Sequence, residues 1–325
     1  MLNSTLPKQV GGFYRMCLAL RSIKRNLAQF FGFTVFLLVT HYTGLANAAS
    51  ADQAGSSAAG TPKVQVARDL VYGDREADDA HLQSLDVYYE DNRSLRPVVI
   101  YVHGGSWAFG DKKDVNYKPD FFVSQGISFV SMNYRLRWDY KLYDQLEDIA
   151  SAISWVKTNG ETFGFDPGRI ILMGHGAGAH LVSLVATDPS YLRAKEMEVS
   201  DVRAVVAIDT LSFDIPRVMK ELGSFIERRQ HRLVFSSDEK VWEAASPIHH
   251  VKESSDIPGF AVLFVADNEA NTLQAKAFTK KLSQAGVDTI MIPGNSKTSD
   301  TIDDELGQLS DTPTQAMMAF IRAKI

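Results

Sequence analysis

Cysteine is almost absent from this sequence. The single cysteine among its 325 residues is Cys17, which lies within the first 48 residues. Those 48 residues contain no Asp or Glu, and their charged side chains are all positive: Lys8, Arg15, Arg21, Lys24 and Arg25. If this segment is removed on export, no thiol remains for a disulfide bond or a cysteine-ligated metal. The stability of the remaining chain must then come from its core.

The N-terminal segment has the pattern of an export signal. Positive residues precede the apolar run FFGFTVFLLV at residues 30–39, and the small-residue motif Ala46-Asn47-Ala48 follows it. A run of this length is short for a membrane span but fits the apolar core of a signal peptide. We therefore predict a signal peptide at residues 1–48 and an exported protein, periplasmic or secreted. The alternative is an uncleaved N-terminal membrane anchor, the one case in which we expect the membrane to be a partner.

Without this segment the chain is acidic. The whole sequence has 34 Lys and Arg against 39 Asp and Glu; removing the five positive residues leaves 29 against 39, a formal net charge of −10. An acidic surface argues against nucleic acid or an anionic membrane as a partner. Residues 49–62, ASADQAGSSAAGTP, are small and polar and predict a flexible linker. Residues 63–325 are long enough for one large domain.

Strand and helix patterns alternate along that domain. Apolar spacing typical of helices covers residues 143–159, 177–186, 271–286 and 312–325. Strand patterns cover residues 64–73, 84–90, 97–105, 126–134, 169–174, 202–209, 259–267 and 288–294. This order predicts an α/β fold with a mostly parallel eight-stranded sheet flanked by helices. The irregular segment 212–248 leaves two interpretations open, a modest cap over the active site or a plain surface excursion.

Two glycine-rich turns follow predicted strands, at the sheet edge where ligands bind in such folds. The strand PVVIYV leads into His103-Gly104-Gly105, and RIILM leads into Gly174-His175-Gly176-Ala177-Gly178. Glycines let backbone N–H groups point at a developing negative charge. Together with HGGSWAFGDK, NYRL, FGFDPGRIILMGH and SPIHHV, these turns resemble the α/β-hydrolases, in the carboxylesterase branch close to feruloyl-esterase-like and arylformamidase-like hydrolases.

The resemblance covers about residues 65–325 and implies an oxyanion hole. Its donors would lie at His103, Gly104 and Gly105, with the N–H of Ala177 as a further donor. The same resemblance implies hydrolysis of carboxylic esters and gives no catalytic role to Ser106, His175, His180, His249 or His250.

The catalytic positions of the family depart from its pattern here. The nucleophilic serine of the family corresponds to Gly176, which has no oxygen to attack a carbonyl. The catalytic histidine corresponds to about Lys297, and no histidine occurs after His250. A solvated lysine is protonated at neutral pH and is a poor base. Asp267 or Glu269 fits the position of the acidic partner.

We therefore predict a carboxylesterase-like protein that is catalytically impaired. It would bind a small carbonyl or ester compound, or a partner protein, in the former active-site pocket. One alternative is an active hydrolase that uses a water molecule near Asp267 or Glu269 together with the oxyanion hole. A second alternative is a purely structural protein.

A nucleotide-cofactor enzyme is a further alternative. Gly174-x-Gly176-x-x-Ala179 fits the glycine fingerprint of dinucleotide-binding turns, which expects an acidic residue about 20 positions later. The candidate here, Asp209, comes 30 residues after Ala179. The histidines and carboxylates also lack metal-ligand spacing. We predict no cofactor and no metal.

Overall fold

The computed structural model describes residues 64–74, 77–91, 94–253 and 256–325. The predicted signal peptide and linker lie outside these residues. Within the described residues, no helix combines the length and hydropathy that crossing a membrane requires.

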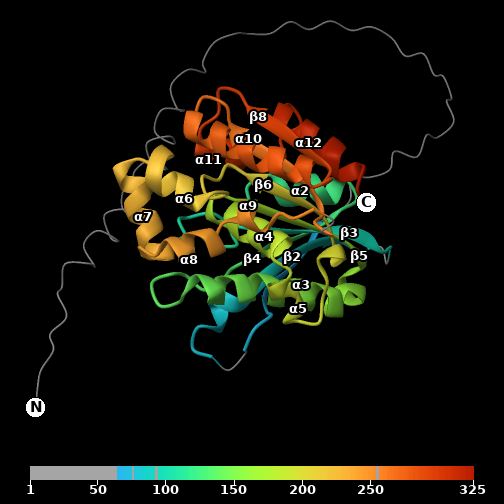
Figure 1. The fold of residues 1–325 in the computed structure, drawn as a ribbon. Helices are drawn as coiled ribbons and strands as arrows, with labels where there is room; N and C mark the ends of the chain where they lie inside the picture. The colour runs from blue at the N-terminus through green and yellow to red at the C-terminus, as the bar shows by residue number, and fades with distance from the viewer. Residues whose placement is uncertain (1–63, 75–76, 92–93, 254–255) are drawn as a thin grey trace, which may run out of the picture. The chain divides into compact units, whose positions relative to one another are not determined.

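An eight-stranded sheet forms the centre of the domain (Figure 1), in the order β1-β2-β4-β3-β5-β6-β7-β8. β2 is antiparallel to both of its neighbours, and all pairs from β4 through to β8 are parallel. The predicted α/β fold with its mostly parallel sheet is confirmed. The strands are β1 (Val64–Val71), β2 (Ser84–Glu90), β3 (Arg96–Val102), β4 (Ser128–Met132), β5 (Phe165–His175), β6 (Val202–Ile208), β7 (Gly259–Val265) and β8 (Thr289–Gly294).

Helices cover both faces of the sheet, so the parallel strands are apolar on both sides. One hydrophobic cluster includes side chains of α3, α4 and α10, and a second includes side chains of α2, α11 and α12. α3 and α12 lie on opposite sides of the sheet (Figure 1). These helices are α2 (Lys118–Ser124), α3 (Leu142–Phe163), α4 (Ala177–Thr187), α10 (Glu269–Gln284), α11 (Ser299–Asp304) and α12 (Thr312–Arg322).

The segment between β6 and β7 is mostly helical. It contains α6 (Ile215–Arg217), the π-helical turn η3 (Val218–Leu222), α7 (Phe225–Phe235), α8 (Glu239–Ala244) and α9 (Pro247–His250). Ser224 caps α7 in a capping box, in which its hydroxyl accepts from the N–H of Glu227 and its own N–H donates to the Glu227 carboxylate. Three short elements complete the fold: η1 (Ala80–Gln83), α5 (Ser190–Arg193) and η2 (Val199–Asp201).

Candidate active site

The carboxyl ends of the central strands meet at one edge of the sheet. Val102 on β3 is paired with Gly174 on β5, and His175 on β5 is paired with Ile208 on β6. The N–H of Gly176 donates to the carbonyl of Ile208 at 2.8 Å. The loops that follow these strands are far apart in sequence but begin side by side. Ligands bind at this carboxyl edge in parallel sheets.

The loop after β3 has an unusual backbone. Gly105, Ser106 and Trp107 have φ angles of 114°, 53° and 59°, three successive residues in the left-handed region. Gly105 has a further reason to be glycine, since a Cβ there would lie 2.2 Å from the carbonyl oxygen of Phe109. Backbone strain of this kind is concentrated at functional sites. The loop thus has the irregular shape of a backbone that presents N–H groups to a ligand.

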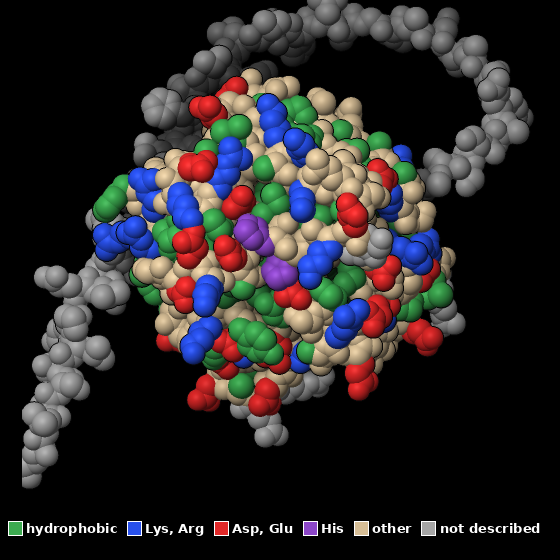
Figure 2. Space-filling view, viewed as in Figure 1, with side chains coloured by type: hydrophobic (Ala, Val, Ile, Leu, Met, Phe, Trp, Pro, Cys, Tyr) green, Lys and Arg blue, Asp and Glu red, His purple; other side chains and the backbone are tan. Residues whose placement is uncertain are grey.

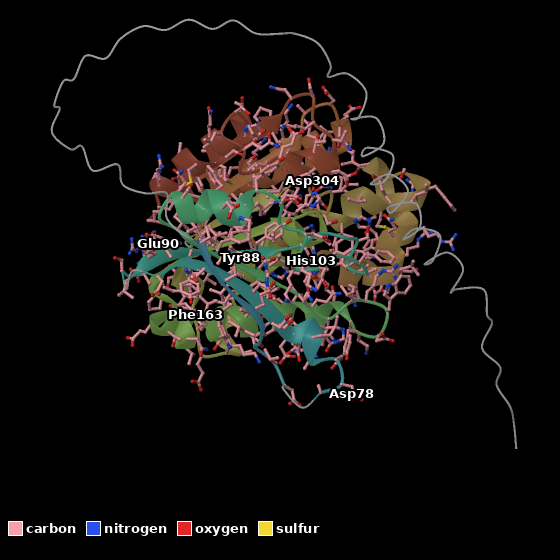
Figure 3. The ribbon with its side chains drawn as sticks, turned by 180° about the vertical axis from the view of Figure 1, so that it is seen from behind. Asp78, Tyr88, Glu90, His103, Phe163 and Asp304 are labelled. Carbon is pink, nitrogen blue, oxygen red and sulfur yellow. The ribbon has the colours of Figure 1, made fainter. Side chains whose placement is uncertain are left out.

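His103 supports this loop from the interior. Its Nδ1 donates to the carbonyl of Gly104 at 2.8 Å, and its ring stacks on Tyr134 at 4.4 Å between centroids. The Tyr134 hydroxyl donates to the His103 carbonyl at 3.0 Å. Burial lowers the pKa of His103, so the ring is neutral at pH 7. Seen from behind, His103 lies inside the ribbon (Figure 3); it holds the loop in place.

The turn after β5 keeps the geometry of a nucleophile elbow. Gly176 has φ 54° and ψ −111°, between the end of the strand and the start of α4 at Ala177. Its only heavy-atom neighbour within 4 Å of an added Cβ would be the Cα of Gly104, at 3.9 Å. Gly178 is different, because a Cβ there would lie 2.1 Å from the carbonyl oxygen of Val102. The elbow therefore lies against the loop after β3 and leaves open space where a side chain would begin.

The predicted oxyanion residues are close to this turn. A Cβ on Gly104 would lie 2.9 Å from Nδ1 and 3.0 Å from the carbonyl oxygen of His175. Ala177 is the first residue of α4, and the first N–H groups of a helix have no acceptor within the helix. The positive end of the α4 dipole also favours negative charge here. Gly104 therefore lies beside Gly176 and His175, and Ala177 begins the helix that follows the elbow.

Lys297 lies in the loop after β8, where the resemblance places a histidine. Its ammonium group pairs with Asp311 at 2.7 Å and with Glu305. Burial opposes the charge, but these two carboxylates outweigh it and raise the pKa of Lys297 above the ordinary value. Asp311 also caps α12, since it accepts from the N–H and hydroxyl of Thr314. Lys297 is therefore a protonated tether between this loop and α12.

The carboxylates near the strand ends differ in their surroundings. Asp267 and Glu269 are exposed, after β7 and at the first position of α10. Asp209, after β6, is buried and accepts from the N–H of Val265 at 3.0 Å and from the side-chain amide of Asn271 at 2.6 Å. Asp209 thus joins β6, β7 and α10, and this Oδ1 is already occupied where a ribose hydroxyl would bind. From the sequence, Asp209 was predicted only as the acidic residue of a dinucleotide fingerprint, and its structural role was not foreseen.

Three histidines outside the loop after β3 make different contacts. The ring of His175 points toward the loop after β8, with Nε2 3.5 Å from the Ser299 hydroxyl. His180 is fully buried: its Nδ1 accepts from the Trp107 indole at 3.2 Å and its Nε2 donates to the Ala245 carbonyl at 2.8 Å. Burial lowers the pKa of His180 to about 4. His250 bonds the carbonyl of Ala244.

Sequence reasoning missed a second serine–histidine contact, between Ser212 and His231. The Nδ1 of His231 donates to the carbonyl of Glu227 at 2.8 Å, so Nε2 accepts from the Ser212 hydroxyl at 2.9 Å. Ser212 is only 1% exposed and lies beneath α7. No spacing in the sequence connects these two residues, because the contact forms only when α7 folds over the end of β6.

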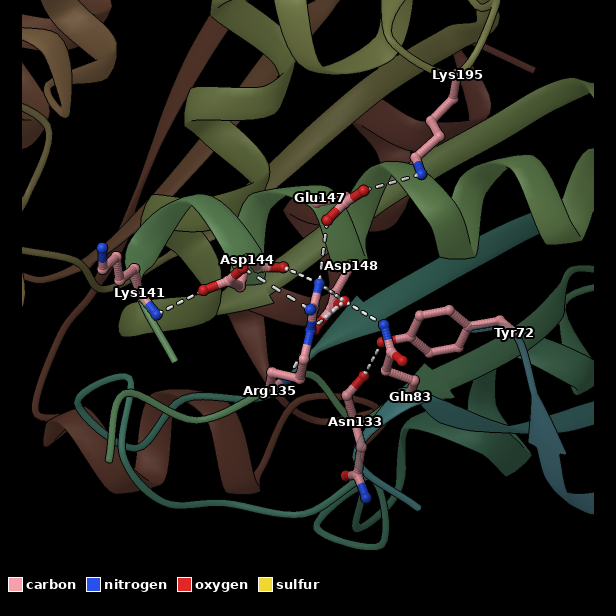
Figure 4. Close-up of polar contacts among 9 residues, drawn as sticks. All are labelled: Tyr72, Gln83, Asn133, Arg135, Lys141, Asp144, Glu147, Asp148 and Lys195. Atoms are coloured by element: carbon pink, nitrogen blue, oxygen red, sulfur yellow. Dashed lines mark hydrogen bonds and ion pairs between the residues drawn. The ribbon is translucent and has the colours of Figure 1, made fainter. Parts of the chain in front are cut away.

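A polar network supports the loop after β4 (Figure 4). The guanidinium of Arg135 pairs with Asp148 at 2.7 Å and with Glu147 at 3.3 Å, and Gln83 donates to Asp148 at 2.7 Å. The carboxylates raise the pKa of Arg135 although burial opposes the charge. Burial raises the pKa of Asp148 despite these partners. The motif NYRL therefore fixes Tyr134, and through it the His103 carbonyl.

The next question is whether side chains in the described residues could bind a metal ion. Among the described residues, no three His, Cys, Asp or Glu side chains converge in an arrangement that could hold a metal ion. His249 lies 3.9 Å from Asp214 and His250 lies 3.8 Å from Asp188, each pair being separate.

The fold and the site together define an α/β-hydrolase. The defining features are the glycine loop after β3, the elbow after β5 and their contact at the carboxyl edge of the sheet. A sequence model of the BD-FAE family matches residues 85–282, and the chain belongs to this family.

Curated relatives are esterases. The chain is 30% identical over 252 residues to esterase LipC of Mycobacterium tuberculosis, which covers 73% of this chain and 60% of that protein. It is 29% identical over 247 residues to isoprenylcysteine alpha-carbonyl methylesterase ICME of Arabidopsis thaliana, covering 72% of this chain and 56% of that one. The chain thus spans a little over half the length of these two relatives.

Solved structures confirm the fold. Esterase B from Lactobacillus rhamnosis superposes with a TM-score of 0.67 at 23% identity, over 80% of this chain and 87% of that one. A truncated carbohydrate esterase from gut microbiota superposes with a TM-score of 0.66 at 18% identity, over 82% and 98%. The family is therefore that of carboxylesterase-like α/β-hydrolases.

Proposed function

We propose that this protein binds a small ester or other carbonyl compound at an esterase-type site but does not transfer acyl groups through a serine. The observation that carries this proposal is the elbow itself. Gly176 occupies the nucleophile's backbone position, in open space beside Gly104, and supplies no side-chain oxygen. The backbone N–H groups of Gly104, Gly105 and Ala177 would donate hydrogen bonds to the carbonyl oxygen of the ligand.

The position of Lys297 supports the same proposal. A general base must be unprotonated to take a proton from a nucleophile. Lys297 is held as an ammonium group by Asp311 and Glu305, with a raised pKa. Among the described residues, no hydrogen bond or ion pair joins the exposed carboxylates Asp267 and Glu269 to a histidine. Binding at the oxyanion donors remains available, whereas proton transfer from a serine does not.

Three measurements on the full-length chain test this proposal. The first two are hydrolysis of p-nitrophenyl butyrate and labelling by a fluorophosphonate probe, which reacts with activated serines. The third is the thermal shift produced by non-chromogenic short-chain esters such as methyl butyrate. We expect no turnover above the blank, no label and a rise in Tm that depends on ester concentration, because a ligand that binds only the folded state stabilises it.

A matched pair of variants tests whether the ester binds beside Gly176. Gly176→Leu puts a large side chain into the open space at the elbow and should abolish the thermal shift. Gly286→Leu is the control, because Gly286 also has a positive φ (81°) and no atom within 4 Å of an added Cβ, but precedes β8 at the opposite edge of the sheet. It also introduces a leucine at a positive φ and should keep the shift.

The remaining outcomes contradict the proposal in different ways. Turnover without a label would show hydrolysis by a route without a reactive serine, and loss of that turnover in Asp267→Ala or Glu269→Ala would assign the water-activating carboxylate. A label on Ser212 would show that the Ser212–His231 contact acts as a nucleophile and base. Absence of any thermal shift with all esters would remove the binding role.

A further inference from the structure

The outer surface of α7 is unusual among the described residues. Twelve large hydrophobic side chains are exposed over the whole described part of the chain, and three of them, Phe225, Ile226 and Leu233, lie within nine residues on this helix. Their exposed fractions are 72%, 67% and 59%. Single exposed apolar residues are normal on a protein surface, but a cluster on one face indicates an interaction site.

The pattern of exposure follows the helix. Five exposed residues, which we name the α7 outer face, occupy positions i, i+1, i+4, i+7 and i+8: Phe225, Ile226, Arg229, Arg232 and Leu233. This spacing places them on one side of an α-helix. The opposite side carries the buried His231 and Phe235. The apolar residues of the outer face are therefore not explained by the core.

The charges on this face are positive and unpaired. Arg229 and Arg232 are exposed, and neither guanidinium has a carboxylate within ion-pair distance among the described residues. Figure 2 shows hydrophobic and basic side chains intermixed at the left edge of the view, where Figure 1 labels α7. This local charge contrasts with the formal net charge of −5 for the whole chain. A helix with an apolar face flanked by arginines has the composition that binds in the interface of a membrane.

We propose that the α7 outer face docks on the surface of an anionic phospholipid bilayer. Phe225, Ile226 and Leu233 would enter the boundary between headgroups and acyl chains, while Arg229 and Arg232 would bind lipid phosphates. Charge complementarity favours this occupant over a second copy of the chain. A two-fold contact through the same face would bring four arginines together without a carboxylate partner.

The inner side of α7 connects this face to the active site. The rings of Phe235 and His231 contact Trp107 at 5.1 Å and 5.7 Å between centroids, and Trp107 ends the strained loop that follows β3. Docking through the α7 outer face would therefore place the bilayer on the outside of a helix whose inner side contacts Trp107 in the loop after β3. The docking proposal does not depend on the ligand proposed above, and it stands or falls by a separate experiment.

A fluorescent label at Leu233 tests the docking directly. In the full-length chain, Cys17→Ser removes the only cysteine, and Leu233→Cys carries an environment-sensitive NBD group. Cys17→Ser with Leu309→Cys is the matched control, because Leu309 is 75% exposed but lies outside the α7 outer face. A position-specific label reports α7 itself, whatever the N-terminal segment does with the same vesicles.

We expect a blue shift and a rise in intensity at position 233 with vesicles of equal phosphatidylglycerol and phosphatidylcholine, and no change at position 309. Vesicles of phosphatidylcholine alone should give a weaker signal, because they carry no net negative charge. Addition of 0.5 M NaCl should also weaken the signal, because salt screens the attraction between the arginines and the lipid phosphates. Arg229→Gln with Arg232→Gln should weaken vesicle affinity by about thirtyfold. These exposed substitutions should leave Tm unchanged.

Four results would overturn the docking proposal. One is the absence of a blue shift at position 233 with anionic vesicles. Another is an equal shift at both positions. A third is an unchanged vesicle affinity in the double arginine variant. The fourth is a blue shift without lipid that grows with protein concentration, which would assign the face to self-association.

Discussion

Gly176 occupies a backbone conformation that costs an L-residue roughly 1–3 kcal/mol. Glycine adopts the same φ of 54° and ψ of −111° without a Cβ penalty. The shape of the turn is fixed by close approaches on both sides, since neither Gly174 nor Gly178 has room for a Cβ. The elbow therefore does not need a side chain at position 176 to hold its shape.

The first prediction restores the missing groups one at a time. An added Cβ at position 176 meets nothing closer than 3.9 Å, so Gly176→Ser should fold. Alone it should leave p-nitrophenyl butyrate hydrolysis within about tenfold of the parent, because under the proposed function no general base serves position 176. Gly176→Ser with Lys297→His should exceed Gly176→Ser by about a hundredfold, the usual contribution of a base.

Lys297→His alone is the control and should remain at background, since it supplies a base without a nucleophile. A hundredfold gain from Gly176→Ser alone would contradict the assignment of the missing base. His175 would then be the histidine to test, because it adjoins position 176 and its Nε2 lies 3.5 Å from the hydroxyl of Ser299, the first residue of α11.

At the scale of elements, α4 is buried along its whole length from Ala177 to Thr187. A helix that is covered on all sides has no solvent face for a polar group, so His180 must find partners inside the protein. It does so with Trp107 from the loop after β3 and with Ala245 at the end of α8. This one side chain joins three elements around the site.

The second prediction concerns acid stability. Because burial lowers the pKa of His180 from 6.5 to about 4, the folded state binds fewer protons than the unfolded state between these values. Its contribution is complete above about pH 6.5 and is lost as pH falls toward 4, which amounts to about 2 kcal/mol between pH 7.5 and pH 5. The pKa values of His103 and His231 are also lowered by burial and act in the same direction.

Urea denaturation at the two pH values measures this loss. His180→Gln keeps a donor for Ala245 but does not titrate, so its stability should fall by less than that of the parent over the same range. His81→Gln, at an exposed position, is the matched control and should keep the parent's slope. An unchanged slope in His180→Gln would show that His180 is not the group that titrates.

The elements were predictable where local pattern decides them. All eight strands lie where apolar periodicity placed them, and so do α3, α4, α10 and α12, four of the five described helices with 11 or more residues. The fifth, α7, lies in the segment 212–248, for which the sequence left two interpretations open. Predicted ends differ by a few residues: the last helix ends at Arg322, and α10 begins at Glu269. The short helices α2, α5 and α11 were not predicted, since four to seven residues carry too little periodicity.

The site was predictable only in part. The glycine motifs predicted both turns, because glycine is typical of positions where the backbone turns sharply or lies close to another segment. The ion pairs of Lys297, the role of Asp209 and the contact of Ser212 with His231 depend on residues 8 to 62 positions apart in sequence. Tertiary packing alone brings such partners together, and no local pattern encodes them.

At the scale of the whole molecule, the loop after β3 is held by groups from distant parts of the chain. Tyr134 donates to the His103 carbonyl, and the side-chain amide of Gln145 donates to the Trp107 carbonyl at 3.0 Å. Tyr134 is followed by Arg135, whose N–H and guanidinium both bind Asp148 on α3. The loop after β3 is thus held in one shape by a network that reaches from η1 to α3.

The third prediction breaks this network at its centre. Arg135→Gln leaves the fully buried Asp148 without its cation, and removing one partner of a buried pair costs about 3–5 kcal/mol. Lys195→Gln removes a partner of Glu147 in the same network, but both of those side chains are partly exposed, so about 0.5 kcal/mol or less should be lost. Urea denaturation at pH 7 measures both changes.

A double variant separates charge burial from simple loss of contact. Adding Asp148→Asn to Arg135→Gln removes the uncompensated charge, so it should recover part of the lost stability, since the desolvation cost is carried by the carboxylate. The ester-dependent thermal shift should fall in Arg135→Gln and stay in Lys195→Gln, because only Arg135 is continuous with Tyr134 and the His103 carbonyl. Equal destabilisation by the Arg135 and Lys195 variants would show that the network acts as surface charge and does not set the shape of the site.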